Sequence, residues 1–511
     1  MLGETVYSGY SKPPGLSLST RGFTTTNSRK PPSHAVVCRL SELISRMTTT
    51  LSGTENRADR RGSEYTFDAT EEGASDEQID ESAAREATIC VVGLGYVGLP
   101  LAVGFAQSNY RVVGYDVDET TVEQLQAGVD TTGDLSDDAI QDGDISYTTD
   151  AAQIGDADYV IIAVPTPIDD DDQPDLRYVE SAATTVGSKM KPGTTVVLES
   201  TVYPGTTREV LAPALEEASD LTAGEGFFVG YSPERATPGD EAHGLADVVK
   251  VVGAQNEKVL DDVAALYESV VDAGVHRAPS IEVAEACKVV ENTQRDLNIA
   301  FVNELSMALE RMDVDADAVL EAAGTKWNFH DYRPGLVGGH CIPVDPYFLA
   351  HRSAREGFEP ELVRTSRKVN ESMPDHVAEL TIKALNQCHK TLCESRVLVL
   401  GLSYKPGVGD IRSSKVANVV ERLEEYDIDV TGFDPFADPE AVRDAFGIDV
   451  QEAVSFDGFD AVVVTTGHDE FERLDLENVA SALESDPALV DTTGTFDETV
   501  AQDAGFVYRR I

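Results

Sequence analysis

The sequence lacks long apolar runs and clustered cysteines. No stretch of about eighteen consecutive apolar residues occurs, and the N-terminus has no apolar segment typical of a signal peptide. No two cysteines form a C-x-x-C pair, and all six are scattered: Cys38, Cys90, Cys287, Cys341, Cys388 and Cys393. We therefore expect a cytoplasmic protein in a reducing compartment, without a disulfide framework or a membrane anchor.

Basic residues are scarce as well. The chain of 511 residues has 40 Lys and Arg against 91 Asp and Glu, a formal net charge of −51. Such a charge repels nucleic acid and anionic membranes, so neither is an expected partner. The excess is spread along the chain and no long like-charge block dominates, which disfavours an acidic interaction tail. The composition resembles the surface of a halophilic cytoplasmic protein.

The first 86 residues differ from the rest of the chain. Residues 1–46 are rich in Ser, Thr and Pro, and they carry six basic and two acidic residues in a chain that is otherwise strongly acidic. Residues 47–86 are acidic and polar. Both compositions are typical of disorder, so residues 1–86 are expected to form a disordered tail. We hypothesise that translation starts at Met47.

From Ala87 onward, short β-rich runs alternate with helical segments, as in "TICVVGLGYVG", "RVVGYDVD" and "DADYVIIAVPTP". This alternation predicts a parallel sheet with helices on both faces. Apolar residues then recur at helical spacing from Ile281 to Met312, and the β pattern restarts at "SRVLVLGLSYKPG". We predict an α/β protein with two doubly wound domains, residues 87–278 and 393–511, joined by a central helical domain, residues 279–392, that contains a long helix.

A glycine motif marks the first domain as a nucleotide site. Gly93, Gly95 and Gly98 form G-x-G-x-x-G directly after a predicted strand, and Asp116 ends the next strand. Glycines allow a tight turn and close approach of a pyrophosphate, and the acidic residue suits a ribose 2′-hydroxyl while repelling a 2′-phosphate. The pattern predicts a Rossmann-like domain that binds NAD in preference to NADP. In the last domain "VLGLSYKPG" lacks the third glycine, so that domain is expected to bind something other than a dinucleotide.

Cys341 lies in the loop "PGLVGGHCIPVDPYFL". A free Cys is often a buried filler, but neighbouring Gly and Pro residues favour an exposed position. His340, Cys341 and Asp345 lack the further ligands that zinc requires, so no metal site is expected. A nucleophilic thiol is the more specific functional interpretation of Cys341. Asp345, followed by Pro346, also fits the N-cap of a helix, and the two interpretations are compatible.

Seven motifs over residues 88–511 together resemble the UDP-glucose/GDP-mannose dehydrogenase superfamily, closest to its UDP-N-acetylhexosamine branch. They are "GLGYVGLP", "VPTP", "ESTVYPGTT", "YSPER.TPGD", "CKVVENTQRDLNIAFVNEL", "GLVGGHCIPVDPYFL" and "GLSYKPGVGDIRSS". The resemblance implies oxidation of the C6 alcohol of a UDP-sugar to a carboxylate by two hydride transfers to NAD, without metal. It also implies a homodimer that pairs through the long helix.

The resemblance assigns roles to individual residues. Cys341 is the implied nucleophile, and Lys288 and Asn292, one helical turn apart, would stabilise an oxyanion at C6. Glu234 and Asp345 would share proton transfer and water activation, with Thr201 positioning the water; which carboxylate is the base stays open. The complete implied sets are, for catalysis, Cys341, Lys288, Asn292, Asp345, Glu234 and Thr201; for NAD, Gly93, Gly95, Tyr96, Val97, Gly98, Asp116, Thr166, Thr201 and Arg412; for the substrate, Glu234, Lys288, Asn292, Arg333, Gly338 and Lys405.

Several alternatives remain at this level. Lys288, Lys405 and Arg412 could be ordinary surface charges. The glucose-specific branch often carries a second glutamate where this chain has Pro238, which argues against a simple UDP-glucose enzyme. UDP-glucose nevertheless stays the nearest alternative substrate. A non-catalytic NAD- and UDP-sugar-binding protein and a single-step β-hydroxyacid dehydrogenase are the other candidates.

Overall fold

The computed structural model describes residues 87–132, 135–141, 145–169, 171–236 and 244–511. The expected disordered tail and Pro238 lie outside the described residues. None of the described helices has the combined length and apolar character that crossing a membrane requires.

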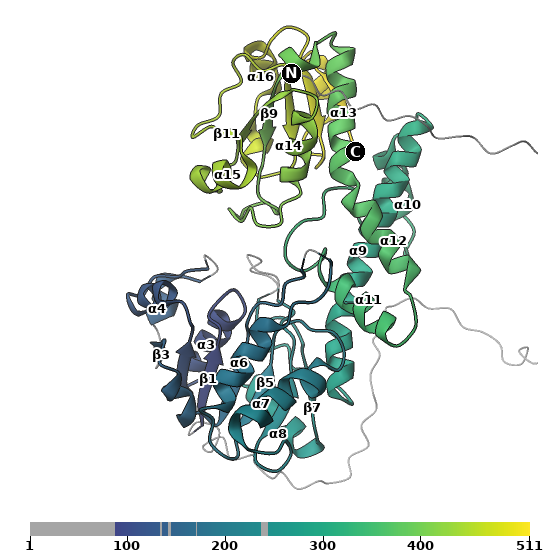
Figure 1. Cartoon of the computed structure of the whole chain (residues 1–511). Helices are drawn as coiled ribbons and strands as arrows, with labels where there is room; N and C mark the ends of the chain where they lie inside the picture. The colour runs from purple at the N-terminus through teal and green to yellow at the C-terminus, as the bar shows by residue number, and fades with distance from the viewer. Residues whose placement is uncertain (1–86, 133–134, 142–144, 170, 237–243) are drawn as a thin grey trace, which may run out of the picture. The chain divides into compact units, whose positions relative to one another are not determined.

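Within the described residues, eight strands form the first sheet (Figure 1). Their order across the sheet is β3-β2-β1-β4-β5-β6-β7-β8. The strands are β1 (Thr88–Val92), β2 (Arg111–Tyr115), β3 (Ile145–Thr148), β4 (Tyr159–Ile162), β5 (Thr195–Leu198), β6 (Phe228–Tyr231), β7 (Lys250–Ala254) and β8 (Val275–Arg277). All neighbouring pairs are parallel except β6 and β7, which are antiparallel. The expectation of a parallel sheet therefore holds except at this pair.

Helices cover both faces of this sheet, which explains why β1 is buried along its whole length. They are α3 (Gly98–Gln107), α4 (Glu119–Gln126), α5 (Asp137–Gln141), the 3₁₀-helix η1 (Ala151–Asp156), α6 (Arg177–Gly187), the π-helical turn η2 (Thr207–Leu211), α7 (Ala212–Ser219) and α8 (Glu257–Glu268). Cys90 and Val92 pack in one core with α6 and α7, whereas Ile89 and Val91 pack in another with α3 and α8. Alternate side chains of one strand thus serve two cores.

The middle of the chain is helical. Its elements are α9 (Ile281–Arg311), α10 (Ala316–Gly324), α11 (Asp345–Arg355), α12 (Glu361–Glu371), α13 (Met373–Gln387) and the 3₁₀-helix η3 (Leu392–Glu394). The predicted long helix is confirmed as α9, which has 31 residues and begins with the Ser280 hydroxyl accepting the Val283 N–H. α9 buries polar side chains toward α12, where Asn370 Nδ2 donates to Asp296 Oδ1 at 2.7 Å. Arg367 makes an ion pair with the same carboxylate.

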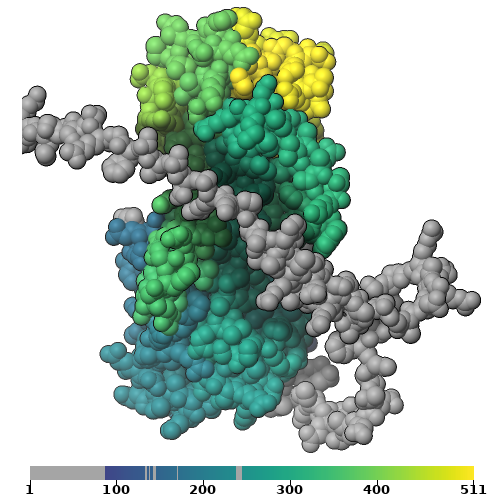
Figure 2. Space-filling view, turned by 90° about the vertical axis from the view of Figure 1, so that its right-hand side faces the viewer, coloured from purple at the N-terminus to yellow at the C-terminus, as the bar shows by residue number. Residues whose placement is uncertain are grey.

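A second sheet follows, with six parallel strands among the described residues in the order β11-β10-β9-β12-β13-β14. Its strands are β9 (Arg396–Leu400), β10 (Asp429–Phe433), β11 (Asp449–Val450), β12 (Ala461–Val464), β13 (Ala488–Asp491) and β14 (Val507–Arg510); its helices are α14 (Val416–Glu424), α15 (Pro439–Phe446), η4 (Phe471–Arg473), α16 (Leu476–Ala482) and α17 (Glu498–Asp503). α13 and α14 share one core with this sheet, and α16 and α17 share the other. The yellow residues at the end of the chain are visible at the surface in Figure 2. Two doubly wound domains and a helical middle region are thus confirmed.

One local expectation is wrong. Asp345 does not cap α11, because it is the first residue inside that helix and Val344 occupies the N-cap position without a side-chain hydrogen bond. The Asp345 carboxylate instead accepts a hydrogen bond from Asn292 on α9. Its side chain is therefore turned toward a neighbouring helix rather than back to its own backbone.

Candidate active site

The turn from β1 into α3 has the geometry that close approach of a pyrophosphate requires. Gly93 has φ +93°, and a Cβ on Gly98 would lie 1.8 Å from the Gly93 carbonyl oxygen, so both positions need glycine. Gly95 differs, because a Cβ there would meet nothing within 4 Å. Val97, at the N-cap of α3, makes no side-chain cap hydrogen bond. The turn leaves room at Gly95 for a phosphate at the helix start.

Asp116 follows β2 directly beside this turn. Its Oδ2 accepts the Leu94 N–H at 2.8 Å and its Oδ1 accepts the Asp118 N–H at 3.0 Å, which fixes the carboxylate at the edge of the sheet. The residue is partly exposed. A carboxylate held in this way fits a ribose 2′-hydroxyl. The residues of the turn and Asp116 therefore suit NAD.

Thr166 and Thr201 follow neighbouring strands, β4 and β5, at the carboxyl edge of the sheet. The Thr166 hydroxyl donates to the Thr201 carbonyl at 2.7 Å, so the structure brings these two predicted residues together. Ligands of open α/β sheets bind at this edge. Both threonines therefore lie at the same edge of the sheet as the turn from β1 into α3, which is called the nucleotide turn below.

The loop that carries Cys341 is anchored at two points. Asn303 on α9 accepts the Gly335 N–H at 2.8 Å, and the Gly339 N–H donates to the Ser413 carbonyl at 3.2 Å. A Cβ on Gly338 would lie 2.9 Å from that same carbonyl oxygen. Gly338 therefore permits a close backbone approach between this loop and the segment after β9.

Cys341 is exposed, as expected from its loop. The protein on the other sides still desolvates the thiol and raises its pKa, the Asp345 carboxylate adds to this increase, and Lys288 opposes it. Both charged groups are thus close enough to act on the sulfur. A thiol with a raised pKa is protonated at neutral pH and needs a base to become a nucleophile.

Asp345 is the carboxylate whose charge acts on the Cys341 thiol. Its exposed fraction is 2%, and burial raises its pKa to about 6, although Lys288 and the hydrogen bond from Asn292 act in the opposite direction. The distance from Asn292 Nδ2 to Asp345 Oδ2 is 2.5 Å. This bond joins the Lys288–Asn292 face of α9 to the helix that begins four residues after Cys341.

Glu234 lies in a different environment, a buried cluster that the sequence motifs did not reveal. Lys250 Nζ donates to Glu234 Oε2 at 2.8 Å and to Glu199 Oε2 at 3.0 Å, and the Tyr267 hydroxyl donates to Glu199. Burial alone would lower the pKa of Lys250, but the two carboxylates outweigh it and raise that pKa. The cluster holds a charged lysine inside the domain.

The pKa values of the two glutamates of this cluster are shifted in opposite directions. Glu199 is 1% exposed, and burial raises its pKa to about 7 despite Lys250. Burial acts on Glu234 too, but Lys250 and the backbone N–H groups of Arg235 and Ala236 outweigh it, so its pKa is lowered. The two pKa values differ because Glu234 accepts hydrogen bonds from Lys250 and two backbone N–H groups, whereas Glu199 accepts them from Lys250 and Tyr267. A Lys within the apolar run "DVVKVVGA" was the one signal in the sequence for a buried cation.

Glu285 on α9 is another buried carboxylate that the motifs did not reveal. It is fully buried and accepts the Gly205 N–H at 2.5 Å and the Thr207 N–H at 2.8 Å. Burial raises its pKa to about 7, although these bonds act in the opposite direction. Its partners tie the start of α9 to the turn before α7, which indicates a structural function.

In the C-terminal domain, Arg412 makes a bidentate ion pair with Asp410, with nitrogen-to-oxygen distances of 2.8 and 3.0 Å. The guanidinium carbon also lies 5.8 Å from the ring centroid of Tyr96 in the nucleotide turn. His340, next to Cys341, lies 3.5 Å from the same Asp410. Burial would raise the pKa of Asp410, but His340 and Arg412 hold it well below its usual range. Asp410 thus contacts both His340 of the Cys341 loop and Arg412, whose guanidinium lies near Tyr96.

Lys405 and Arg333, two of the predicted substrate contacts, are both accessible to solvent. Lys405 is partly exposed on the segment after β9. Arg333 is exposed and makes ion pairs with Asp317 at 3.4 Å and Asp331 at 3.0 Å. Among the described residues no group of His, Cys, Asp and Glu side chains is arranged to hold a metal ion.

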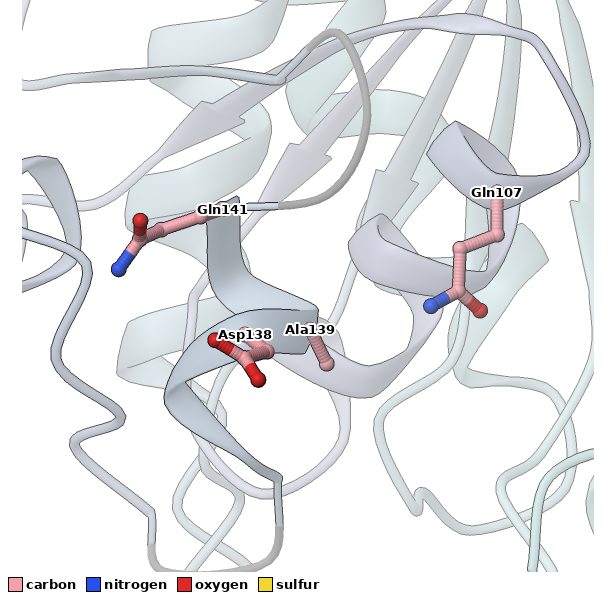
Figure 3. Close-up of a pocket in the computed structure, with 4 residues that line it drawn as sticks. All are labelled: Gln107, Asp138, Ala139 and Gln141. Atoms are coloured by element: carbon pink, nitrogen blue, oxygen red, sulfur yellow. The ribbon is translucent and has the colours of Figure 1, made fainter.

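A surface pocket is lined by none of these residues. It is lined by Gln107 at the end of α3 and by Asp138, Ala139 and Gln141 of α5 (Figure 3). One carboxylate and two amides include no thiol and no second titratable group. The pocket therefore carries no chemistry that competes with the Cys341 site.

The fold and the turn after β1 define a dinucleotide-binding α/β protein with two Rossmann-like domains. The chain belongs to the UDP-glucose/GDP-mannose dehydrogenase family: residues 87–271 match its NAD binding domain, residues 282–372 its central domain, and residues 398–498 its UDP binding domain. It is thus an oxidoreductase that acts on CH–OH groups, of the UDP-sugar dehydrogenase type. The expected family and cofactor are confirmed.

Named relatives cover most of the chain. The Protein CapL of Staphylococcus aureus is 45% identical over 75% of this chain and 90% of its own length. A UDP-N-acetyl-D-glucosamine 6-dehydrogenase of Pseudomonas aeruginosa is 41% identical over 81% of this chain and 98% of its own. The solved structure of a UDP-D-ManNAc dehydrogenase from Pyrococcus horikoshii has a TM-score of 0.75 and 32% identity, covering 83% of this chain and 99% of that one.

Proposed function

We propose that the protein oxidises the C6 primary alcohol of a UDP-N-acetylhexosamine to the uronic acid. The observation that carries the proposal is the hydrogen bond between Asn292 and Asp345, which joins the Lys288–Asn292 face of α9 to the Cys341 loop. An oxyanion-stabilising pair, a base and a nucleophile are the groups that a two-step oxidation of an alcohol requires.

In the first oxidation the C6 hydroxyl loses a proton to a carboxylate and a hydride from carbon. When bound, NAD would supply the oxidising power, with one NAD+ taking up one hydride in each oxidation, so that two NAD+ are consumed per sugar. Lys288 supplies positive charge, and Asn292 supplies an amide, to the oxygen that becomes negative at C6. Asp345 is the proton acceptor, because its raised pKa makes it the stronger base, whereas the lowered pKa of Glu234 suits a fixed charge that orients the substrate.

After the first oxidation the base releases its proton to solvent. In the second oxidation the Cys341 sulfur adds to the C6 aldehyde, and the thiol proton moves to the base. The resulting thiohemiacetal loses a second hydride and becomes a thioester. Water then attacks the thioester carbonyl, which releases the carboxylate and regenerates the thiol. Thr201 would position that water, consistent with its place at the carboxyl end of β5 beside Thr166.

The named relatives, which include enzymes for UDP-N-acetyl-D-glucosamine and UDP-D-ManNAc, support this class of sugar. The galacto isomer is a third candidate. UDP-glucose is the alternative, since sugars that differ by one substituent are separated by only a few contacts. Lys405, Arg333 and Gly338 are proposed to contact the substrate, and Arg412 to contact the cofactor pyrophosphate, for which a guanidinium fork is well suited.

We further propose a cytoplasmic homodimer whose product enters surface polysaccharide or glycan synthesis. Three exposed apolar side chains of α9, Val283, Val290 and Phe301, are 46%, 49% and 58% exposed, and their spacing places them on one helical face. A second copy could cover this face. The acidic composition supports adaptation to concentrated salt, where light scattering should measure the dimer.

The substrate test uses purified protein in concentrated KCl with NAD and, separately, UDP-GlcNAc, UDP-GalNAc, UDP-ManNAc and UDP-glucose. NADH absorbance and product analysis give the number of NADH formed per sugar consumed. Two NADH per N-acetylhexosamine are expected. Turnover of UDP-glucose alone would contradict the proposed sugar, and one NADH per sugar would contradict the two-step reaction.

The nucleophile is tested by Cys341→Ser. Since a hydroxyl is a poorer nucleophile than a thiol, the variant should stall before the second oxidation and lose steady-state formation of the uronic acid. Cys393→Ser is the matched control, because Cys393 is also exposed but lies outside the site. Full turnover of Cys341→Ser to the uronic acid would refute the thioester route.

A further inference from the structure

The two sheet domains use the same first turn. Gly93 follows β1 and Gly401 follows β9, with φ of +93° and +85°. The Gly93 N–H donates to the Tyr115 carbonyl at 2.9 Å, and the Gly401 N–H donates to the Phe433 carbonyl at 2.8 Å. Each acceptor is the last residue of the neighbouring strand. The C-terminal domain therefore repeats the entrance of a dinucleotide site.

The acidic residue after the second strand is repeated too. Asp116 Oδ2 accepts the Leu94 N–H at 2.8 Å, and Asp434 Oδ2 accepts the Leu402 N–H at 2.7 Å. The difference is access. Asp116 is partly exposed, whereas the side chain of Asp434 is only 1% exposed. In the second domain, the Asp434 carboxylate is therefore covered by another part of the protein and is not accessible to a ribose.

His468 covers it. This residue is the fourth after the end of β12, the same position that Thr166 has after β4. Its imidazole is fully buried, and Nε2 lies 3.0 Å from Asp434 Oδ2. The ring packs against Phe436 and Phe471, at centroid distances of 5.1 and 5.5 Å. The ribose position of a dinucleotide is thus closed by a histidine that comes from a neighbouring strand.

The other ring nitrogen holds the loop after β9. The Gly407 N–H donates to His468 Nδ1 at 3.1 Å, so Nδ1 is an acceptor and the ring proton is on Nε2, facing Asp434. The Ser403 hydroxyl lies 3.3 Å from Nε2 and donates to the Lys405 carbonyl at 3.1 Å. The Ser403 N–H also donates to Asp434 Oδ2 at 3.0 Å, so the imidazole and the carboxylate that it faces together hold both ends of residues 403–407, which carry Lys405.

We propose that His468 is a positioning residue of a nucleoside-diphosphate site in the C-terminal domain: it closes Asp434 to a ribose and fixes residues 403–407 so that Lys405 meets the diphosphate. The identity of the ligand as a UDP-sugar rests on the proposed function. A histidine fits this position, where the first domain has a threonine, because its Nε2 faces Asp434 while its Nδ1 accepts the Gly407 N–H.

Three variants separate the two bonds. In His468→Asn the side-chain oxygen can replace Nδ1 as the acceptor for Gly407, whereas in His468→Gln the amide can replace Nε2 as the donor to Asp434. His468→Phe keeps an aromatic ring but loses both bonds. Calorimetry measures the Kd of UDP and, in parallel, of NAD for each variant and the wild type, and hydrogen exchange measures protection of the peptide containing Gly407.

If His468 acts through Gly407, His468→Gln and His468→Phe should raise the Kd of UDP about tenfold, the effect of one lost buried hydrogen bond, with increased exchange at Gly407. His468→Asn should stay close to the wild type, and the Kd of NAD should not change in any variant. Equal UDP binding by all variants, or equal weakening by Asn and Gln, would overturn the inference. A wild type that binds NAD but no UDP would refute the proposed substrate class instead.

Discussion

The pH dependence of the reaction should change when Asn292 is replaced by leucine. The Asn292 amide donates to the buried Asp345 carboxylate at 2.5 Å and lowers its pKa. A hydrogen bond to a charged group contributes about 1.5–3 kcal/mol, and one pKa unit corresponds to about 1.4 kcal/mol. Losing the bond should therefore raise the pKa of Asp345 from about 6 by roughly 1 to 2 units.

The assay is kcat/KM for the UDP-sugar between about pH 5 and pH 9, since this quantity reports the groups of the free enzyme. A base must be ionised, so activity falls below its pKa. The acidic limb of the wild type should lie near pH 6, and that of Asn292→Leu should be displaced to higher pH. The height of the profile should fall as well, because Asn292 is proposed to contact the substrate, but only the position of the limb tests the argument.

Asn298→Leu is the matched control. Asn298 lies on the same helix, and its amide donates only to the Gln294 carbonyl of that helix, at 2.6 Å. Its profile should overlay the wild type. An acidic limb that stays near pH 6 in Asn292→Leu would refute Asp345 as the base, and a limb displaced to lower pH would contradict the proposed effect of the hydrogen bond.

Two further substitutions test the buried cluster and the nucleotide turn. Lys250→Met leaves Glu199 and Glu234 without their cation and should cost about 3–5 kcal/mol of unfolding free energy in urea. Without the cation, the folded pKa of both carboxylates should lie above the unfolded value, so the loss of stability should grow as pH rises from 6 to 8. Adding Glu199→Gln to Lys250→Met should recover part of the lost stability. A loss of stability that is independent of pH would contradict this reasoning. Gly98→Ala places a Cβ 1.8 Å from the Gly93 oxygen and should lower both Tm and NAD affinity, whereas Gly95→Ala, with nothing within 4 Å, should lower NAD affinity alone. Unchanged NAD affinity in Gly95→Ala would mean that the pyrophosphate does not approach that residue.

The sequence by itself determined the features that depend on neighbouring residues. The turn of Gly93, Gly95 and Gly98 is readable because only glycine tolerates its backbone geometry. The periodicity of α9 and the exposed loop around Cys341 follow from local spacing and from Gly and Pro. Strand β7 and its antiparallel pairing with β6 escaped prediction, since pairing joins segments that no local pattern relates.

Only the tertiary structure decided the electrostatics of the site. The pKa of Asp345 depends on burial and on Asn292, 53 residues earlier in the chain, and the charge of Lys250 depends on Glu199, 51 residues earlier. Gly407 and His468 are 61 residues apart, yet they share one hydrogen bond. A residue type states which charges and bonds are available, but desolvation and long-range partners set their strength, and these exist only once the chain has folded.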